Sequence, residues 1–316
     1  MKTIFNTFKK PSFYKLLGCV IIALITNIES GFAQQEPQYT QYMYNTMAIN
    51  PAYAGQRDVL SISGLYRSQW VGISGAPETQ SFGIHSPLRN KKMGLGLTVV
   101  NDKIGPASEI YVNANFSYTL LLNENDLKLS FGVKGGFNHL NMDWNKGKIK
   151  NQDQSFRENI SQYSPTIGAG FYLHNKKWYV GLSVPSFLTT KQFRENEYAV
   201  GKERLHYYLI GGYVFDLSEN LKFKPSTFLK AVAGAPLTVD LSANFLLYEK
   251  FTAGLAYRWD DSVSGLVGFQ ATEDLFIGYA YDYTTTDLQD YNNGSHEIML
   301  RFEFRKDSPY LSPRFF

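Results

Sequence analysis

The chain has 316 residues, and 22 Tyr and 23 Phe contribute to an aromatic content of 16% alongside 26 Gly and a negative mean hydropathy. Its 31 basic and 28 acidic residues give a formal charge of +3, but four of the lysines and one glutamate lie before residue 34. Without residues 1–33 the chain has 27 residues of each sign and no cysteine. This excludes non-specific nucleic-acid binding, a disulfide framework and thiolate metal sites.

Residues 1–33 are typical of a signal peptide. Lysines precede a short apolar run, Leu16 to Thr26, and Gly31-Phe32-Ala33 supplies small residues for cleavage. The run is shorter than the roughly 20 residues that a membrane-spanning helix needs. We therefore predict export and cleavage after Ala33. A lipoprotein box ending at Cys19 is the alternative, but it would leave the apolar Val20 to Ile25 in the mature chain.

Residues 34–57 form a polar, tyrosine-rich segment before the first predicted strand. They are too polar to span a membrane, so we predict an N-terminal periplasmic segment. One interpretation is an ordered cap that packs its own tyrosines. The other is a docking strip for partner proteins, because Tyr supplies both apolar area and a hydroxyl. The candidate partner-docking residues are Tyr39, Tyr42, Asn50 and Pro51.

Residues 58–305 contain about fourteen segments in which apolar and polar residues alternate, as in Ile298, Leu300 and Phe302 against Glu297 and Arg301. Successive strand residues point to opposite faces, so each segment has one apolar and one polar face. We predict an all-β transmembrane antiparallel up-and-down β-barrel with a C-terminal tail at 306–316. The predicted strands are 58–67, 78–85, 92–101, 108–120, 126–138, 164–173, 177–184, 204–215, 221–230, 236–247, 250–260, 262–271, 274–284 and 294–305.

The lengths of the predicted connections support this topology. When the connections are numbered in chain order, the even-numbered ones are all short. The long ones, 68–77, 139–163, 185–203 and 285–294, are all odd-numbered. Bacterial barrels have short periplasmic turns and longer outside loops. We therefore predict an even number of strands, with 139–163 and 185–203 on the cell surface.

The polar faces carry charges of both signs, which would be costly in lipid and so are expected to face inward. This predicts a lumen with a packed ionic network or a narrow polar interior. A soluble sandwich would also alternate, but it predicts fewer aromatics on exposed faces. The inward charges include Lys128, Lys134, Lys222, Lys224, Lys230, Asp240, Arg258, Asp282, Arg301 and Glu303.

We find no sequence signature of a catalytic, cofactor or metal site. None of the five His has a Ser two positions away, so a Ser–His pair would have to form across strands. No His cluster has metal-ligand spacing. Asp143-Trp144-Asn145-Lys146-Gly147 has the start of a calcium loop without its later ligands, which favours a solvated loop.

The segment before the first strand also carries a family resemblance. It reads Gln38-Tyr39-Thr40-Gln41-Tyr42-Met43-Tyr44-Asn45 and then Ala48-Ile49-Asn50-Pro51-Ala52-Tyr53-Ala54-Gly55. These are followed by Leu65-Tyr66-Arg67-Ser68-Gln69-Trp70-Val71-Gly72, Gly75-Ala76-Pro77, Gly94-Leu95-Gly96 and Asn101-Asp102-Lys103-Ile104-Gly105-Pro106. This succession resembles the PorP/SprF family of Bacteroidetes membrane proteins of the type IX secretion system, densely over 34–120 and more loosely beyond.

The resemblance implies an outer-membrane barrel without enzymatic activity or cofactors. It implies partners among the type IX secretion machinery, secreted or surface-anchored cargo proteins such as gliding adhesins, and outer-membrane lipid, with no nucleic acid. The expected function is export or cell-surface anchoring of specific cargo. A passive porin or uptake channel is the alternative, since a barrel fold alone does not fix function.

Overall fold

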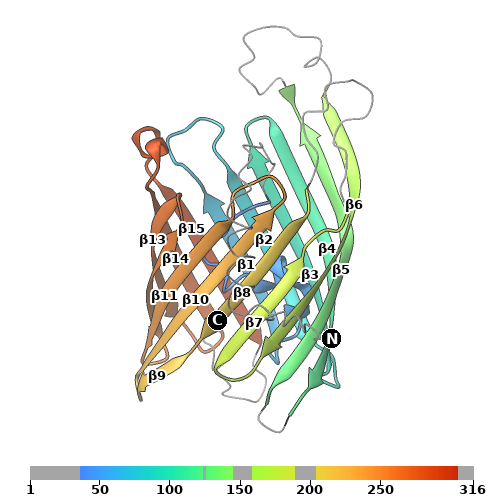
Figure 1. Ribbon diagram of the computed structural model, residues 1–316, viewed down its shortest axis with the longest axis vertical. Helices are drawn as coiled ribbons and strands as arrows, with labels where there is room; N and C mark the ends of the chain where they lie inside the picture. Colours follow the sequence, from blue (N-terminus) through green and yellow to red (C-terminus); the bar gives the residue numbers. More distant parts are fainter. Residues whose placement is uncertain (1–35, 124–125, 145–158, 189–203, 305–316) are drawn as a thin grey trace, which may run out of the picture.

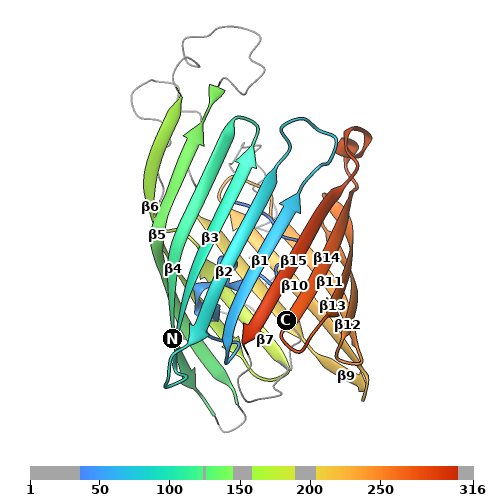
Figure 2. The ribbon, with the colours of Figure 1, turned by 180° about the vertical axis from the view of Figure 1, so that it is seen from behind.

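The structure is a computed structural model that describes residues 36–123, 126–144, 159–188 and 204–304. These residues form one antiparallel sheet that closes into a barrel around a short N-terminal segment (Figures 1 and 2). The barrel has fourteen strand positions, which confirms the predicted fold class. The predicted signal peptide, 1–33, and C-terminal tail, 306–316, lie wholly outside the described residues.

The strands follow the sequence predictions to within a few residues. In chain order they are β1 (Leu60–Ser68), β2 (Glu78–Pro87), β3 (Met93–Ile104), β4 (Ala107–Leu121), β5 (Lys128–Met142), β6 (Ile160–His174), β7 (Trp178–Val184), β8 (His206–Tyr213), β9 (Phe215–Ser218), β10 (Leu221–Val232), β11 (Thr238–Leu247), β12 (Phe251–Arg258), β13 (Ser262–Gln270), β14 (Leu275–Thr284) and β15 (Ser295–Phe304).

The barrel has fourteen positions because β8 and β9 share one of them. Both pair with β10, and the buried Val214 interrupts the ladder between them. Closure comes from β15, which pairs with β1 over its length, from Leu60 opposite Phe304 to Ser68 opposite His296. With every neighbour paired, the sheet has no open seam, as a hydrocarbon environment requires.

The side chains on the two faces of each strand differ in solvent exposure, as the alternation predicts. On β15, Ile298 and Leu300 are 47% and 48% exposed, whereas Glu297 and Met299 are fully buried. On β12, Leu255 is exposed and Arg258 is buried. The exposed side chains point to the outside of the barrel and the buried ones to the lumen.

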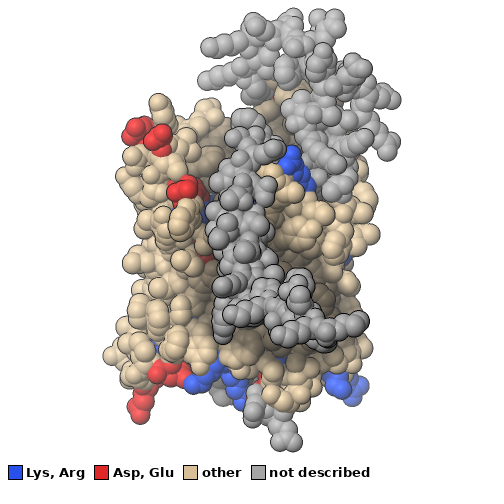
Figure 3. Space-filling model, viewed as in Figure 1, with Lys and Arg blue, Asp and Glu red and all other residues tan. Residues whose placement is uncertain are grey.

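The outer surface suits a bilayer. In Figure 3, the Lys, Arg, Asp and Glu side chains of the face in view gather toward the two ends of the barrel, with an uncharged belt between them. Large apolar side chains such as Val133, Phe171 and Leu241 make up the exposed surface of the strands. In the part of the chain that the structure describes, no helix is both long and apolar enough to cross a membrane.

One end of the barrel carries the tight turns and the other carries the long connections. At the tight-turn end, Lys176 Nζ lies 2.7 Å from Asp126 Oδ2 and Lys177 Nζ lies 3.1 Å from Asp216 Oδ2. The hydrogen bond from Lys176 holds the pKa of Asp126 below its usual range. At the opposite end lie the 3-10 helix η4 (Asp287–Tyr291) and the connections in which 145–158 and 189–203 fall outside the described residues.

The orientation in the membrane is testable with single cysteines, since the predicted mature chain has none. Gln289→Cys, on η4, should react with a membrane-impermeant maleimide on intact cells because long connections face outward. Asn90→Cys, in the turn between β2 and β3, should react only after the outer membrane is permeabilised. The opposite labelling pattern would reverse the topology.

Leu300→Arg should impair barrel assembly, because Leu300 lies mid-strand on the outer face of β15. A cation there costs roughly 2–4 kcal/mol near the bilayer midplane. The measurement is the heat-modifiable folded fraction in outer-membrane preparations. Glu273→Arg, in a tight turn, is the matched control and should leave the folded fraction unchanged. Equal tolerance of both substitutions would contradict the assignment of the two faces.

Candidate functional site

The N-terminal segment lies inside the barrel. We refer to residues 36–57 as the plug. It includes the short helix α2 (Thr46–Ile49) and the 3-10 helix η1 (Pro51–Tyr53), and almost all of its side chains from Tyr39 to Gly55 are buried. It begins near the end with the long connections, where Glu36 contacts Tyr208, and ends beside the tight turns. The sequence analysis placed this segment outside the barrel, on the periplasmic side, and the structure places it in the lumen.

The four candidate docking residues are therefore surrounded by the barrel wall. Tyr39 and Tyr42 are 7% and 2% exposed, and Tyr42 stacks on Phe228 of β10 with ring centroids 5.3 Å apart. Asn50 is fully buried, and Pro51, also buried, opens η1. In this arrangement their side chains contact the barrel and offer no surface to a periplasmic partner. A docking role for them stays a prediction that requires the plug to leave the lumen.

A charged cluster on β1, β14 and β15 holds the upper part of the plug. Glu297 accepts hydrogen bonds from the main-chain N–H groups of Thr40 and Gln41, at 2.9 and 2.7 Å. Asp282 accepts from the Thr40 hydroxyl at 2.7 to 2.8 Å. Arg67 Nη1 lies 2.7 Å from Asp282 Oδ2 and 3.3 Å from Glu297 Oε2. Two wall carboxylates are thus shared between a wall arginine and the plug, Glu297 through plug main-chain N–H groups and Asp282 through the Thr40 hydroxyl.

The middle of the plug lies against glycines on the inner face of the wall. A Cβ on Gly132 of β5 would clash with the main chain at Pro51 and Ala52, and one on Gly94 of β3 would clash with the Ala54 carbonyl. Only glycine allows this close approach. The Asn50 side chain links the plug to the wall. Its Oδ1 accepts a hydrogen bond from Ala52 N at 3.0 Å, and its Nδ2 donates one to the Phe171 carbonyl of β6 at 2.9 Å.

The lower end of the plug is fixed by polar side chains near the tight turns. Gln56 Nε2 donates to Thr119 Oγ1, and its Oε1 lies 2.9 Å from His174 Nε2. Arg57 forms a close ion pair with Glu303 near the end of β15. The plug therefore contacts both early and late strands along the whole depth of the lumen.

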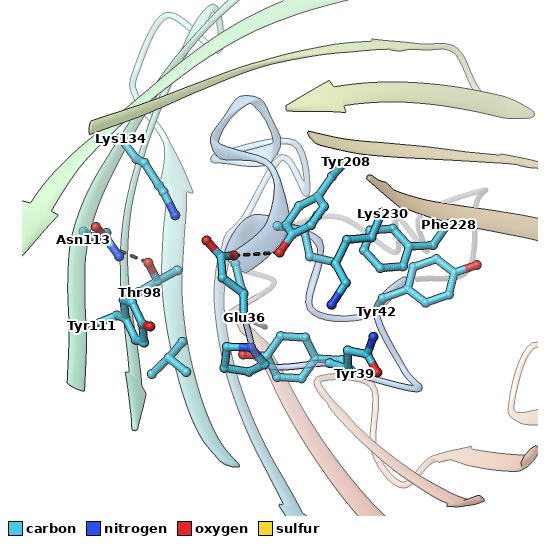
Figure 4. Close-up of a pocket in the computed structure, with 15 residues that line it drawn as sticks. Glu36, Tyr39, Tyr42, Thr98, Tyr111, Asn113, Lys134, Tyr208, Phe228 and Lys230 are labelled. Carbon is cyan, nitrogen blue, oxygen red and sulfur yellow. Dashed lines mark hydrogen bonds between the residues drawn. The ribbon is translucent and has the colours of Figure 1, made fainter. Parts of the chain in front are cut away.

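A small cavity of about 50 Å³ remains between the upper plug and the wall (Figure 4). Glu36 Oε2 accepts a hydrogen bond from the Tyr208 hydroxyl at 2.7 Å. Lys134 of β5 and Lys230 of β10 lie on either side of Glu36 in this view. Above the plug, at the end with the long connections, a larger cavity of about 550 Å³ is lined by Trp70 among others and has Glu36 in its floor.

Several of the predicted inward charges form buried ion pairs in the lumen, among them Asp240, Arg258 and Asp282. Arg258 Nε donates to Asp240 Oδ1 at 2.8 Å, and both side chains are buried. Lys224 and Lys230 are also buried. Lys222 differs, because it reaches the tight-turn end and pairs there with the exposed Glu249.

The structure brings one Ser–His pair together across strands. His139 Nε2 of β5 lies 3.0 Å from Ser161 Oγ of β6, on the outer face of the barrel. The His139 ring stacks on Tyr163 with centroids 4.2 Å apart, and among the described residues no carboxylate is seen to hydrogen-bond to its Nδ1 as in a catalytic triad. Among the same residues, no three His, Cys, Asp or Glu side chains are grouped to hold a metal ion.

The fold and the filled lumen define an outer-membrane β-barrel closed by its own N-terminal segment. Residues 31–302 match the family described as type IX secretion system membrane protein PorP/SprF. The chain therefore belongs to this family, which confirms the resemblance carried by the sequence motifs. A family of secretion-system membrane barrels is not one of enzymes.

Comparison with curated proteins gives no match. Among solved structures, the CymD monoaromatic hydrocarbon channel is similar with 14% identity and a TM-score of 0.50, over 83% of this chain and 93% of that one. Omp33 of Acinetobacter baumannii has 9% identity and a TM-score of 0.47, over 78% of this chain and 98% of that one. At these identities the likeness concerns the barrel fold alone.

The close contact between the plug main chain and the wall can be tested at Gly132. Gly132→Val should displace the middle of the plug, because the added side chain occupies the place of the Ala52 main chain. We expect a folded barrel with a lower melting midpoint and an ion conductance in planar bilayers several-fold above that of the wild type. Gly135→Val, three residues along β5 and with open space around its Cβ, is the matched control. Wild-type conductance in a folded Gly132→Val protein would show that the contact at Gly132 is not needed to keep the lumen closed to ions.

Proposed function

We propose that this protein supports the export or cell-surface anchoring of specific cargo proteins, such as gliding adhesins, as a closed barrel in the outer membrane. Family membership supports the link to type IX secretion. The observation that carries the closed-barrel part is the plug, which occupies the lumen from Glu36 to Arg57. The cargo would contact the barrel from outside and would not pass through it.

The plug argues against the alternative of a passive porin or uptake channel. The cavities left beside Glu36 and Arg301 have volumes of about 50 and 10 Å³. Such volumes hold a few water molecules at most. Removing the plug would leave Asp282, Glu297 and Glu303 without their plug partners. Opening would break the buried Arg57–Glu303 ion pair and the buried hydrogen bonds from Thr40 and Gln41, so spontaneous opening is disfavoured.

The proposed partners follow from the surfaces that remain available. The apolar belt is expected to contact outer-membrane lipid. Components of the secretion machinery and the cargo are left with the two rims of the barrel and with the cavity above the plug. Tyr39, Tyr42, Asn50 and Pro51 would join such an interface only if a partner drew the plug out.

A deletion strain tests the proposal. Its surface and medium proteomes, compared with those of the wild type, should show loss of one or a few surface proteins, while uptake of small hydrophilic solutes stays unchanged because the barrel is closed. Complementation with the wild-type gene or with the Gly135→Val allele should restore surface display. Reduced solute uptake with an unchanged surface proteome would instead establish the porin function.

A further inference from the structure

Two arginines at the lower end of the lumen have guanidinium nitrogens without hydrogen-bond partners. Arg57 of the plug and Arg301 of β15 have side chains that are 4% and 8% exposed. Arg57 Nη1 and Arg301 Nε and Nη1 are buried and make no hydrogen bond. Buried donors of this kind are uncommon in folded proteins and call for an explanation, such as a bound ion or water.

Both guanidinium groups converge on one carboxylate oxygen. Arg57 pairs closely with Glu303 Oε1, and Arg301 Nε lies 3.4 Å from the same atom, without the alignment of a hydrogen bond. Two cations thus share one anion. The Arg301 guanidinium also lies 5.5 Å from the ring centroid of Tyr44 and 5.0 Å from that of Phe276.

The neighbouring histidine, His85, adds no positive charge to the site. His85 Nδ1 accepts a hydrogen bond from the Gly55 main-chain N–H at 3.1 Å, so this nitrogen carries no proton. The ring is therefore neutral, with its other nitrogen as a donor. Within the described ranges, Glu303 is the one carboxylate that pairs with Arg57 and Arg301, and His85 adds no charge beside them.

The arginines border a small cavity inside the lumen. This cavity, of about 10 Å³, is lined by Arg57, Arg301 and His85 together with the hydroxyl-bearing Ser61 and Ser63 of β1. This is roughly the volume that one water-sized particle occupies. Water could accept from the unpaired N–H groups, but it would leave the surplus charge uncompensated in a buried site.

We propose that this cavity is a binding site for one small monovalent anion of chloride size. The anion accepts hydrogen bonds from Arg57 Nη1 and Arg301 Nη1, and it compensates the second guanidinium that Glu303 alone cannot balance. Because Arg57 ends the plug and Arg301 belongs to the closing strand, the anion ties the lower end of the plug to the wall. This site is independent of the proposed role in secretion.

The test uses the full mature protein in detergent at constant ionic strength, with sodium gluconate replaced stepwise by sodium chloride. Gluconate is too large for the cavity. The melting midpoint, followed by heat modifiability, should rise saturably by about 2–4 °C once chloride exceeds its dissociation constant several-fold. Crystals grown in sodium bromide should show an anomalous peak between Arg57 and Arg301.

Arg301→Gln should abolish the chloride response. Ser63→Val, which fills the cavity without changing its charge, should do the same and serves if Arg301→Gln fails to fold. Arg258→Gln is the matched control, because Arg258 is a buried lumen arginine with its own carboxylate partners, and it should keep the response. A midpoint insensitive to chloride, an unchanged response in Ser63→Val, or a water without bromide signal in the cavity would overturn the proposal.

Discussion

A sheet that closes in a bilayer must turn its apolar side chains outward, and the two-residue period of the strand then turns every other side chain into the lumen. About eight strands enclose a space that side chains can fill, and larger barrels leave a channel. Fourteen strand positions therefore require something more than wall side chains. Here residues 36–57 occupy that space and supply the polar partners that inward charges such as Asp282 and Glu297 need.

The same period explains why the wall could be predicted from the sequence. On β4, Phe116 and Tyr118 face outward while Asn115 and Ser117 are buried, as the alternation indicated. Lipid outside and polar groups inside impose this pattern on each strand separately, so local sequence was sufficient. The parity of short and long connections supported an up-and-down barrel with an even number of strands, and the strand order of the sheet confirms it.

The place of the plug could not be predicted in this way. A polar, tyrosine-rich segment suits the periplasm and a polar lumen equally, so its composition does not decide between them. The deciding contacts join distant residues, as Asn50 to Phe171, 121 positions apart. The one local signal was glycine at inward positions such as Gly94 and Gly132, where a side chain would clash with the plug. The space that these glycines leave accommodates the plug main chain.

Plug seating and barrel closure are physically coupled. Arg57 lies three positions before the start of β1, yet its partner Glu303 lies 246 positions away on β15. Thr40 likewise contacts Glu297, 257 positions away. The pairing of β15 with β1 already brings these residues together, so the plug contacts add little further loop-closure entropy. Conversely, drawing the plug out would remove Arg57 from Glu303 and the Thr40 and Gln41 hydrogen bonds from Glu297 on the closing strand. A partner that docks through the plug must therefore supply binding free energy comparable to the loss of a buried ion pair and several buried hydrogen bonds.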